Sequence, residues 1–212
     1  MARVFSIHPD HPQPRLIEQA AEVVRGGGLI ALPTDSAYAL CGHVGDADLL
    51  QRIRRIRGVD ERHHFTLMCR DLSEIATYAR VDNATFRLLK ATTPGSYTFI
   101  LEGTKELPRR VLHPKRKTIG LRIPDHPLTL ALLEELDEPL LTSTLILAGE
   151  HTPLADADEI DERIGKLIDL VIDAGPCGSE ATTVINLVGG TPELVRAGRG
   201  ALAPFGLAEP LC

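Results

Sequence analysis

The sequence lacks tryptophan and has few other aromatic residues, with three tyrosines and five phenylalanines among 212 residues. Proteins that read single-stranded RNA stack its bases on aromatic side chains, so this scarcity argues against specific RNA readout. The cysteines stand far apart without a CxxC pair, at Cys41, Cys69, Cys177 and Cys212. This spacing predicts reduced, structural cysteines rather than a zinc site or a disulfide framework.

Long apolar runs are also missing. No run approaches the roughly 20 residues that a membrane helix needs, and the first residues lack the apolar core of a signal peptide. We therefore expect a cytoplasmic protein without a membrane segment. Hydrophobic residues make up 43% and charged residues 25%, which is ordinary for globular proteins. No repeat or long linker divides the chain, so we expect one domain over residues 1–205 and a loose tail over 206–212.

Charge is segregated along the chain. Residues 51–122 hold sixteen Lys or Arg against seven Asp or Glu, whereas residues 134–173 hold two against twelve. Any one of these charge runs could simply be the solvent-exposed face of a helix. The basic residues, however, adjoin the motifs described below, which favours an anionic ligand such as a nucleotide or RNA on one side of the molecule.

Helical and strand patterns interleave without strict alternation. Apolar spacing and capping residues predict helices over residues 15–25, 46–57 and 127–136, two short helices after Asp71 and Asp82, and an acidic helix over 158–168. Short apolar runs predict strands over residues 29–33, 65–69, 97–101, 118–123, 139–144, 170–173, 182–187 and 193–196. The pattern predicts a single-domain α/β fold with a twisted, mixed, largely open sheet and helices on both faces.

Several polar residues stand at strand ends or helix ends, where each has a structural and a functional interpretation. The Thr34 hydroxyl can form a turn or bind a ligand, and the arginines that end at Arg57 suit a helix C-terminus or a phosphate. Arg122 interrupts an apolar strand, so its guanidinium should meet an anion.

His63 and His64 face opposite ways on an extended chain, which argues against a shared metal ion, although one of them could contact phosphate. We expect no metal site and no nucleophilic catalytic group.

Four stretches resemble, in order and spacing, motifs of the YrdC/YciO family, the threonylcarbamoyl-AMP synthases and their paralogues. They are residues 29–38, 94–101, 120–127 and 182–187, and the resemblance covers roughly residues 15–200. It implies a YrdC-like fold with a basic cavity over the sheet. It implies threonine and bicarbonate binding by Thr34, Arg57, Arg122 and Thr182. It implies nucleotide binding by Arg55, Arg57, Thr118, Ser143 and Arg196.

The chain departs from the family pattern at several motif positions, among them Gly58, where the family has proline, and His63-His64-Phe65, where it has Lys/Asn-Pro-Leu. Asp35 stands where the family has glutamate, Arg55 where it has lysine, and Leu145 where the synthases have asparagine. A guanidinium is not a point ammonium charge, and leucine lacks the donor and acceptor of an amide. These departures resemble the YciO branch and leave the level of enzymatic activity open.

The resemblance implies an L-threonylcarbamoyladenylate synthase, a nucleotidyltransferase that converts L-threonine, bicarbonate and ATP with Mg²⁺ into threonylcarbamoyl-AMP and pyrophosphate. That product serves tRNA modification, which makes tRNA a possible partner. One alternative is a non-catalytic paralogue that binds double-stranded RNA or a nucleotide. A second is a carbamoyl-transfer module similar to that of hydrogenase maturation proteins, although their accompanying zinc-finger and acylphosphatase segments are missing from the sequence.

Overall fold

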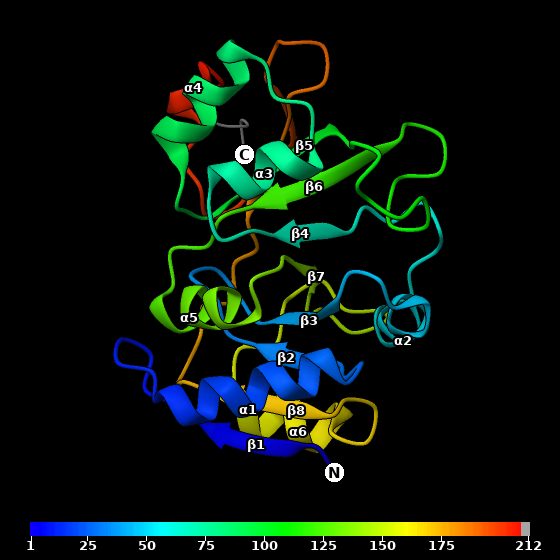
Figure 1. Cartoon of the computed structure of the whole chain (residues 1–212), viewed down its shortest axis with the longest axis vertical. Helices are drawn as coiled ribbons and strands as arrows, with labels where there is room; N and C mark the ends of the chain where they lie inside the picture. Colours follow the sequence, from blue (N-terminus) through cyan, green and yellow to red (C-terminus); the bar gives the residue numbers. More distant parts are fainter. Residues whose placement is uncertain (209–212) are drawn as a thin grey trace.

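A computed structural model describes residues 1–208 and shows a ten-stranded mixed sheet with helices on both faces (Figure 1). The strands lie in the order β1-β8-β2-β3-β7-β4-β6-β5-β9-β10. Their bounds are β1 (Arg3–Ser6), β2 (Ile30–Leu32), β3 (Ala39–His43), β4 (Thr66–Met68), β5 (Tyr97–Glu102), β6 (Thr118–Arg122), β7 (Leu140–Thr144), β8 (Leu170–Asp173), β9 (Thr183–Asn186) and β10 (Glu193–Arg196). Parallel and antiparallel pairs alternate irregularly across the sheet, which confirms the predicted fold class.

The helices cover the sheet because its strands bury both faces. They are α1 (Pro14–Arg25), α2 (Ala47–Arg57), α3 (Leu72–Tyr78), α4 (Asn83–Thr92), α5 (Pro127–Leu136) and α6 (Ala157–Ile164), with a short 3₁₀ turn at Ala203–Phe205. In β2, Ile30 and Leu32 pack in the apolar cluster with α1 and α5, whereas Ala31 packs in the cluster with α2 and α6. Successive side chains of a strand point to opposite faces of the sheet, so the strand contributes to one apolar core on each face.

The ends of α2 fix the arginine-rich segment against the sheet. The Asp46 carboxylate accepts hydrogen bonds from the backbone N–H groups of Asp48 and Leu49, at 2.8 and 3.2 Å. Gly58 ends the helix in the left-handed region with φ 64°, which suits glycine because a side chain there is strained. Arg57 is thus held at the last position of a capped helix.

The predicted helices are confirmed, but two strands were missed and one helix is shorter than predicted. The strands β1 and β3 have no polar and apolar alternation that would reveal them; four of the five residues of β3 are buried, and only His43 is partly exposed. Gly42 in β3 lets α2 approach closely, since a Cβ there would lie 2.5 Å from Leu49. The acidic helix ends at Ile164, before Gly165, rather than continuing to residue 168.

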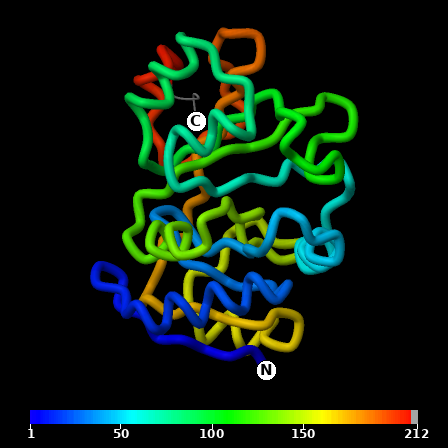
Figure 2. Tube along the Cα trace, viewed as in Figure 1, coloured from blue at the N-terminus to red at the C-terminus, as the bar shows by residue number. Residues whose placement is uncertain are grey.

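One segment, residues 174–182, runs from β8 to β9 and thereby passes between distant parts of the sheet. It lies at the start of the orange part of the tube in Figure 2. Along its way the Cys177 backbone N–H donates to the Ala155 carbonyl at 3.0 Å, and the Cys177 thiol contacts the Thr34 carbonyl at 3.1 Å. We call residues 174–182 the crossing segment. It brings the strand that follows it, β9, next to β5.

Of the predicted tail, residues 206–208 follow the 3₁₀ turn, and residues 209–212, which include Cys212, lie outside the described residues. No helix within residues 1–208 has both the length and the apolar character that crossing a membrane requires.

Candidate functional site

A cavity of about 470 Å³ lies over the strands between β7 and β10. Its floor and walls come from β4, β5, β6, β7, β9 and β10, and α2 and the loop after it supply further side chains. Among the residues that the structure describes, ten polar ones line the cavity: Arg57, Arg62, His63, His64, Thr66, Thr98, Ser143, Thr144, Thr182 and Arg196. The cavity therefore gathers residues that are far apart in the sequence.

Arg57, His63 and Ser143 form a hydrogen-bonded cluster at one wall. The Arg57 guanidinium Nη1 donates to Ser143 Oγ at 2.5 Å and lies 2.9 Å from His63 Nε2. His63 Nε2 is also 2.9 Å from Ser143 Oγ. Because a guanidinium has only donors, His63 Nε2 must be the acceptor and the ring proton must sit on Nδ1. Three segments of the chain thus fix one another at the cavity wall.

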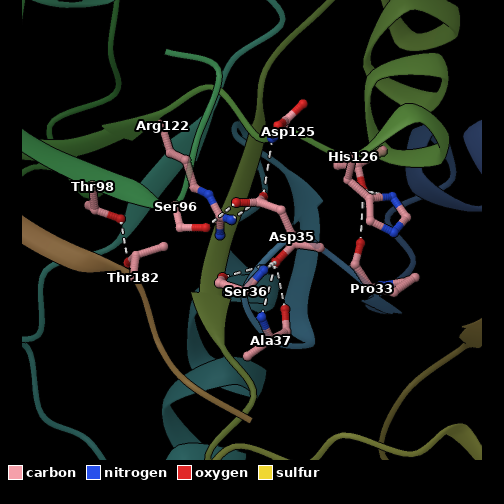
Figure 3. Close-up of polar contacts among 12 residues, drawn as sticks. Pro33, Asp35, Ser36, Ala37, Ser96, Thr98, Arg122, Asp125, His126 and Thr182 are labelled. Carbon is pink, nitrogen blue, oxygen red and sulfur yellow. Dashed lines mark hydrogen bonds and ion pairs between the residues drawn. The ribbon is translucent and has the colours of Figure 1, made fainter. Parts of the chain in front are cut away.

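Arg196 and two threonines form a second cluster. Arg196 Nη2 donates to the Thr182 carbonyl at 2.8 Å and to Thr182 Oγ1 at 3.2 Å. The hydroxyls of Thr98 and Thr182 are 2.9 Å apart (Figure 3). Strand β10 thereby presents its last residue, Arg196, to the strand pair β5 and β9.

The cavity is basic and its lining, as the described residues define it, includes no aspartate or glutamate. Burial, and after it the charge of Arg196, lowers the pKa of Arg57 to about 10. Burial also lowers the pKa of Arg196, and the charge of Arg122 adds to this shift. The pKa of His63 falls to about 4, first through burial and then through the nearby Arg57. These shifts show that the positive charges of the cavity are poorly compensated, because no carboxylate of its described lining pairs with them. An anionic ligand would supply the missing negative charge.

A smaller chamber of about 20 Å³ lies below the cavity, and we call it the inner chamber. The two share Thr66, Thr98, Thr144 and Thr182, and the inner chamber is further lined by Ser36, Ala37, Tyr38, Ala39, Arg122 and Thr142. Arg122 is 6% exposed, as the apolar pattern of its strand predicts. Its guanidinium forms an ion pair with Asp35, so the anion that it meets belongs to the chain itself (Figure 3).

Three of the residues predicted for the site do not line the cavity or the inner chamber. The Thr34 hydroxyl is buried in its own turn, where it donates to the Ala37 carbonyl at 2.7 Å. Arg55 lies on the exposed face of α2. Thr118 is buried at the start of β6, with its hydroxyl 3.3 Å from His64 Nε2. Of the others, Arg57, Ser143, Thr182 and Arg196 line the cavity and Arg122 the inner chamber.

Sequence reasoning did not assign site roles to Asp35, Thr66 or Thr98, and it left His63 as a possible phosphate contact. Thr98 follows Tyr97 in a strand with the pattern Tyr-Thr-Phe-Ile-Leu, so a lone hydroxyl among apolar residues was the available signal. Asp35 was noted only as a replacement. Its partner, Arg122, is 87 positions away, and only the folded sheet brings the two together.

Comparison with known proteins gives a consistent result. A family model for the Sua5/YciO/YrdC domain, described as "Telomere recombination", matches residues 22–198. Protein YciO of Escherichia coli (strain K12) is 54% identical over 205 residues, which cover 97% of this chain and all of that protein. The crystal structure of E. coli YciO superposes with a TM-score of 0.94 over 97% of this chain and 100% of that chain, at 54% identity.

More distant relatives carry functional names. The threonylcarbamoyl-AMP synthase of Mus musculus is 26% identical over 196 residues, which cover 92% of this chain and 67% of that protein. The crystal structure of P. abyssi Sua5 complexed with L-threonine has a TM-score of 0.84 over 92% of this chain and 57% of that chain. At 24% identity that structure shows a shared fold.

Proposed function

Because the chain belongs to the Sua5/YciO/YrdC family, we propose that its cavity binds ATP and L-threonine and forms threonylcarbamoyl-AMP from them and bicarbonate. The observation that carries the proposal is the basic lining of the cavity, in which Arg57 and Arg196 face the same space without a carboxylate among the described lining residues. Cavities of about 300–1,000 Å³ commonly hold small-molecule ligands, and this one has about 470 Å³. The named function of distant relatives supports the same assignment.

The proposed nucleotide contacts are Arg57, Ser143 and Arg196, because their side chains line the cavity. Thr182 and Arg122 are the proposed amino-acid contacts at its floor. Thr34 and Thr118 support these contacts, through the turn beside the inner chamber and through His64 respectively. Arg55 lies on the exposed face of α2 and does not line the cavity, so it is not among the proposed contacts.

The chemistry places a modest demand on the protein. The threonine amine and bicarbonate give a carbamate and water, a carbamate oxygen attacks the α-phosphorus of ATP, and the bond to the β-phosphate breaks to release pyrophosphate. Charge therefore accumulates on phosphate oxygens, where Arg57 and Arg196 would neutralise it. His63 Nε2 already accepts from Arg57 Nη1, so its proposed role is to hold that guanidinium in place.

Mg²⁺ would arrive as part of the nucleotide substrate. Within residues 1–208 no group of three or more His, Cys, Asp or Glu side chains is placed to hold a metal ion. Mg²⁺ commonly binds nucleotide phosphates and water with few protein ligands, which agrees with a cavity lined by cations and hydroxyls.

The test is pyrophosphate release from ATP, L-threonine and bicarbonate by the parent protein and by Arg57→Ala. Arg55→Ala is the matched control, since it removes an exposed arginine from the same helix. We expect activity in the parent and in Arg55→Ala, and a loss in Arg57→Ala. ATP binding without pyrophosphate release in the parent would instead favour the non-catalytic nucleotide- or RNA-binding paralogue, and titration with double-stranded RNA and tRNA would then distinguish these partners.

A further inference from the structure

The inner chamber has room for one small chemical group. Its volume is about 20 Å³, and a buried water needs about 10–15 Å³ of such space. It opens from the floor of the cavity, because four threonines line both spaces. A ligand in the cavity can therefore insert one atom, with its hydrogens, into the inner chamber.

The charge inside the inner chamber is balanced by Asp35. Its carboxylate accepts hydrogen bonds from Ser96 Oγ at 2.6 Å and from the Asp125 backbone N–H at 3.2 Å, and it pairs with Arg122 Nη2 (Figure 3). The side chains of Arg122 and Asp35 are only 7% and 10% exposed. A buried guanidinium that already has a carboxylate partner gains little from a second anion, which would itself remain unbalanced.

One donor of Arg122 is nevertheless free. Its Nε is buried and has no hydrogen-bond partner among the residues that the structure describes. Buried N–H groups in folded proteins nearly always have an acceptor, supplied by the protein, by water or by a ligand. Since Arg122 lines the inner chamber, an oxygen placed there is the natural acceptor.

We propose that Asp35 determines the ligand specificity of the inner chamber: by balancing Arg122 it makes this subsite accept a single neutral oxygen, such as the hydroxyl of a β-hydroxy amino acid, and reject an anion. The identity of the amino acid rests on the proposed function. The carboxylate of the amino acid then stays near Arg57 and Arg196 in the cavity. Its side-chain hydroxyl reaches down among the threonines to the free N–H of Arg122.

The first experiment compares L-threonine with L-aspartate as ligands of the parent and of Asp35→Asn by isothermal titration calorimetry. The parent should bind threonine at least about tenfold more tightly, and Asp35→Asn should reverse or abolish that preference, because an unbalanced buried cation attracts the aspartate side chain. Asp125→Asn is the control: it removes a neighbouring exposed carboxylate, keeps the backbone N–H that Asp35 uses, and should leave the preference unchanged.

The second experiment does not depend on amino-acid binding. Crystals of each protein are soaked in bromide, and the anomalous signal at the inner chamber is measured. We expect bromide next to Arg122 in Asp35→Asn, and neither in the parent nor in the double variant Asp35→Asn/Arg122→Met. If no protein binds threonine but bromide enters only Asp35→Asn, the proposed function fails while the role of Asp35 stands.

Two results would overturn the inference. One is a parent protein that binds aspartate as tightly as threonine, and the other is an Asp35→Asn variant with unchanged preference and no bromide. Should Asp35→Asn not fold, Asp35→Glu replaces it. Its chamber keeps both the balanced charge and the N–H of Arg122 and should retain the preference for threonine, so a preference for aspartate would equally contradict the role of Asp35.

Discussion

The cavity and the inner chamber differ in how the charge of a buried guanidinium is balanced. In the inner chamber Arg122 is paired with Asp35 within the chain. In the cavity, the partners of Arg57 and Arg196 within residues 1–208 are neutral groups, namely Ser143, His63, Thr182 and a backbone carbonyl. The charges of the first arrangement are balanced without a ligand, so the pair contributes to the folded state. The second is complete only when an anion binds, so its contribution appears as affinity.

Arg122→Met should have the largest effect, and on stability. It removes the partner of a buried carboxylate, and breaking a buried pair in this way typically costs about 3–5 kcal/mol. Urea unfolding of the parent, of Arg122→Met and of Asp35→Asn/Arg122→Met measures the effect. The double variant should recover most of the loss. A single variant as stable as the parent would show that the pair does not stabilise the fold, and the contrast between the two sites would fail.

Arg57→Ala and Arg196→Ala should weaken ATP binding without a comparable loss of stability. Each removes a charge-assisted contact worth about 1.5–3 kcal/mol, which corresponds to roughly 10- to 150-fold in affinity. Calorimetric titration with ATP, together with urea unfolding of the same samples, separates binding from stability. Arg55→Ala should bind ATP as the parent does. Equal loss of binding in all three variants would mean that the cavity wall is not where the nucleotide binds.

The smallest expected effect is a pH dependence of stability from His63. Its pKa is about 4 in the folded protein, below the usual 6.5, because of burial and the nearby Arg57, His64, Arg196 and Arg54. The unfolded chain therefore binds more protons between pH 6.5 and 4, so stability should fall as pH decreases through that window. The slope contributed by one such group is at most about 1.4 kcal/mol per pH unit.

The measurement is the difference between the parent and His63→Gln in urea unfolding at pH 7, 6, 5 and 4.5. The glutamine variant should lose less stability as the pH falls. His64 and His126 also have lowered pKa values and are present in both proteins, so their contributions cancel in the difference. Parallel curves for the two proteins would contradict the neutral state assigned to His63.

The sequence predicted the local parts of the site better than their pairing. The apolar residues around Arg122 in its strand predicted that its side chain is buried. The helical spacing of the apolar residues in α2 predicted that the arginines lie at the C-terminal end of a helix. The period also separates them: Arg57 lies four positions after the buried Ile53, whereas Arg55 points to solvent. The pairing of Arg122 with Asp35 could not be predicted, because it depends on the order in which distant strands join the sheet.

Leu145, where the family motif has asparagine, is a second case in which the sequence alone could not predict the packing. By resemblance it stands where an asparagine reaches the nucleotide, yet here the side chain is fully buried in the apolar cluster. Its backbone N–H donates to the Tyr38 carbonyl at 2.8 Å. Leu145→Asn would therefore bury an amide at a cost of about 1–3 kcal/mol if it found no partner. A motif alignment names a position, but packing decides which way its side chain points.

The crossing segment sets how far the two ends of the sheet can separate. Seven inter-strand steps lie between β8 and β9, roughly 34 Å along the sheet at about 4.8 Å each. The chain from Asp173 to Thr183 has ten steps between successive Cα atoms, which extend to about 33–36 Å. The segment thus acts as a tether with little slack. Widening the sheet would stretch this segment, so it limits how far the two ends of the sheet can move apart.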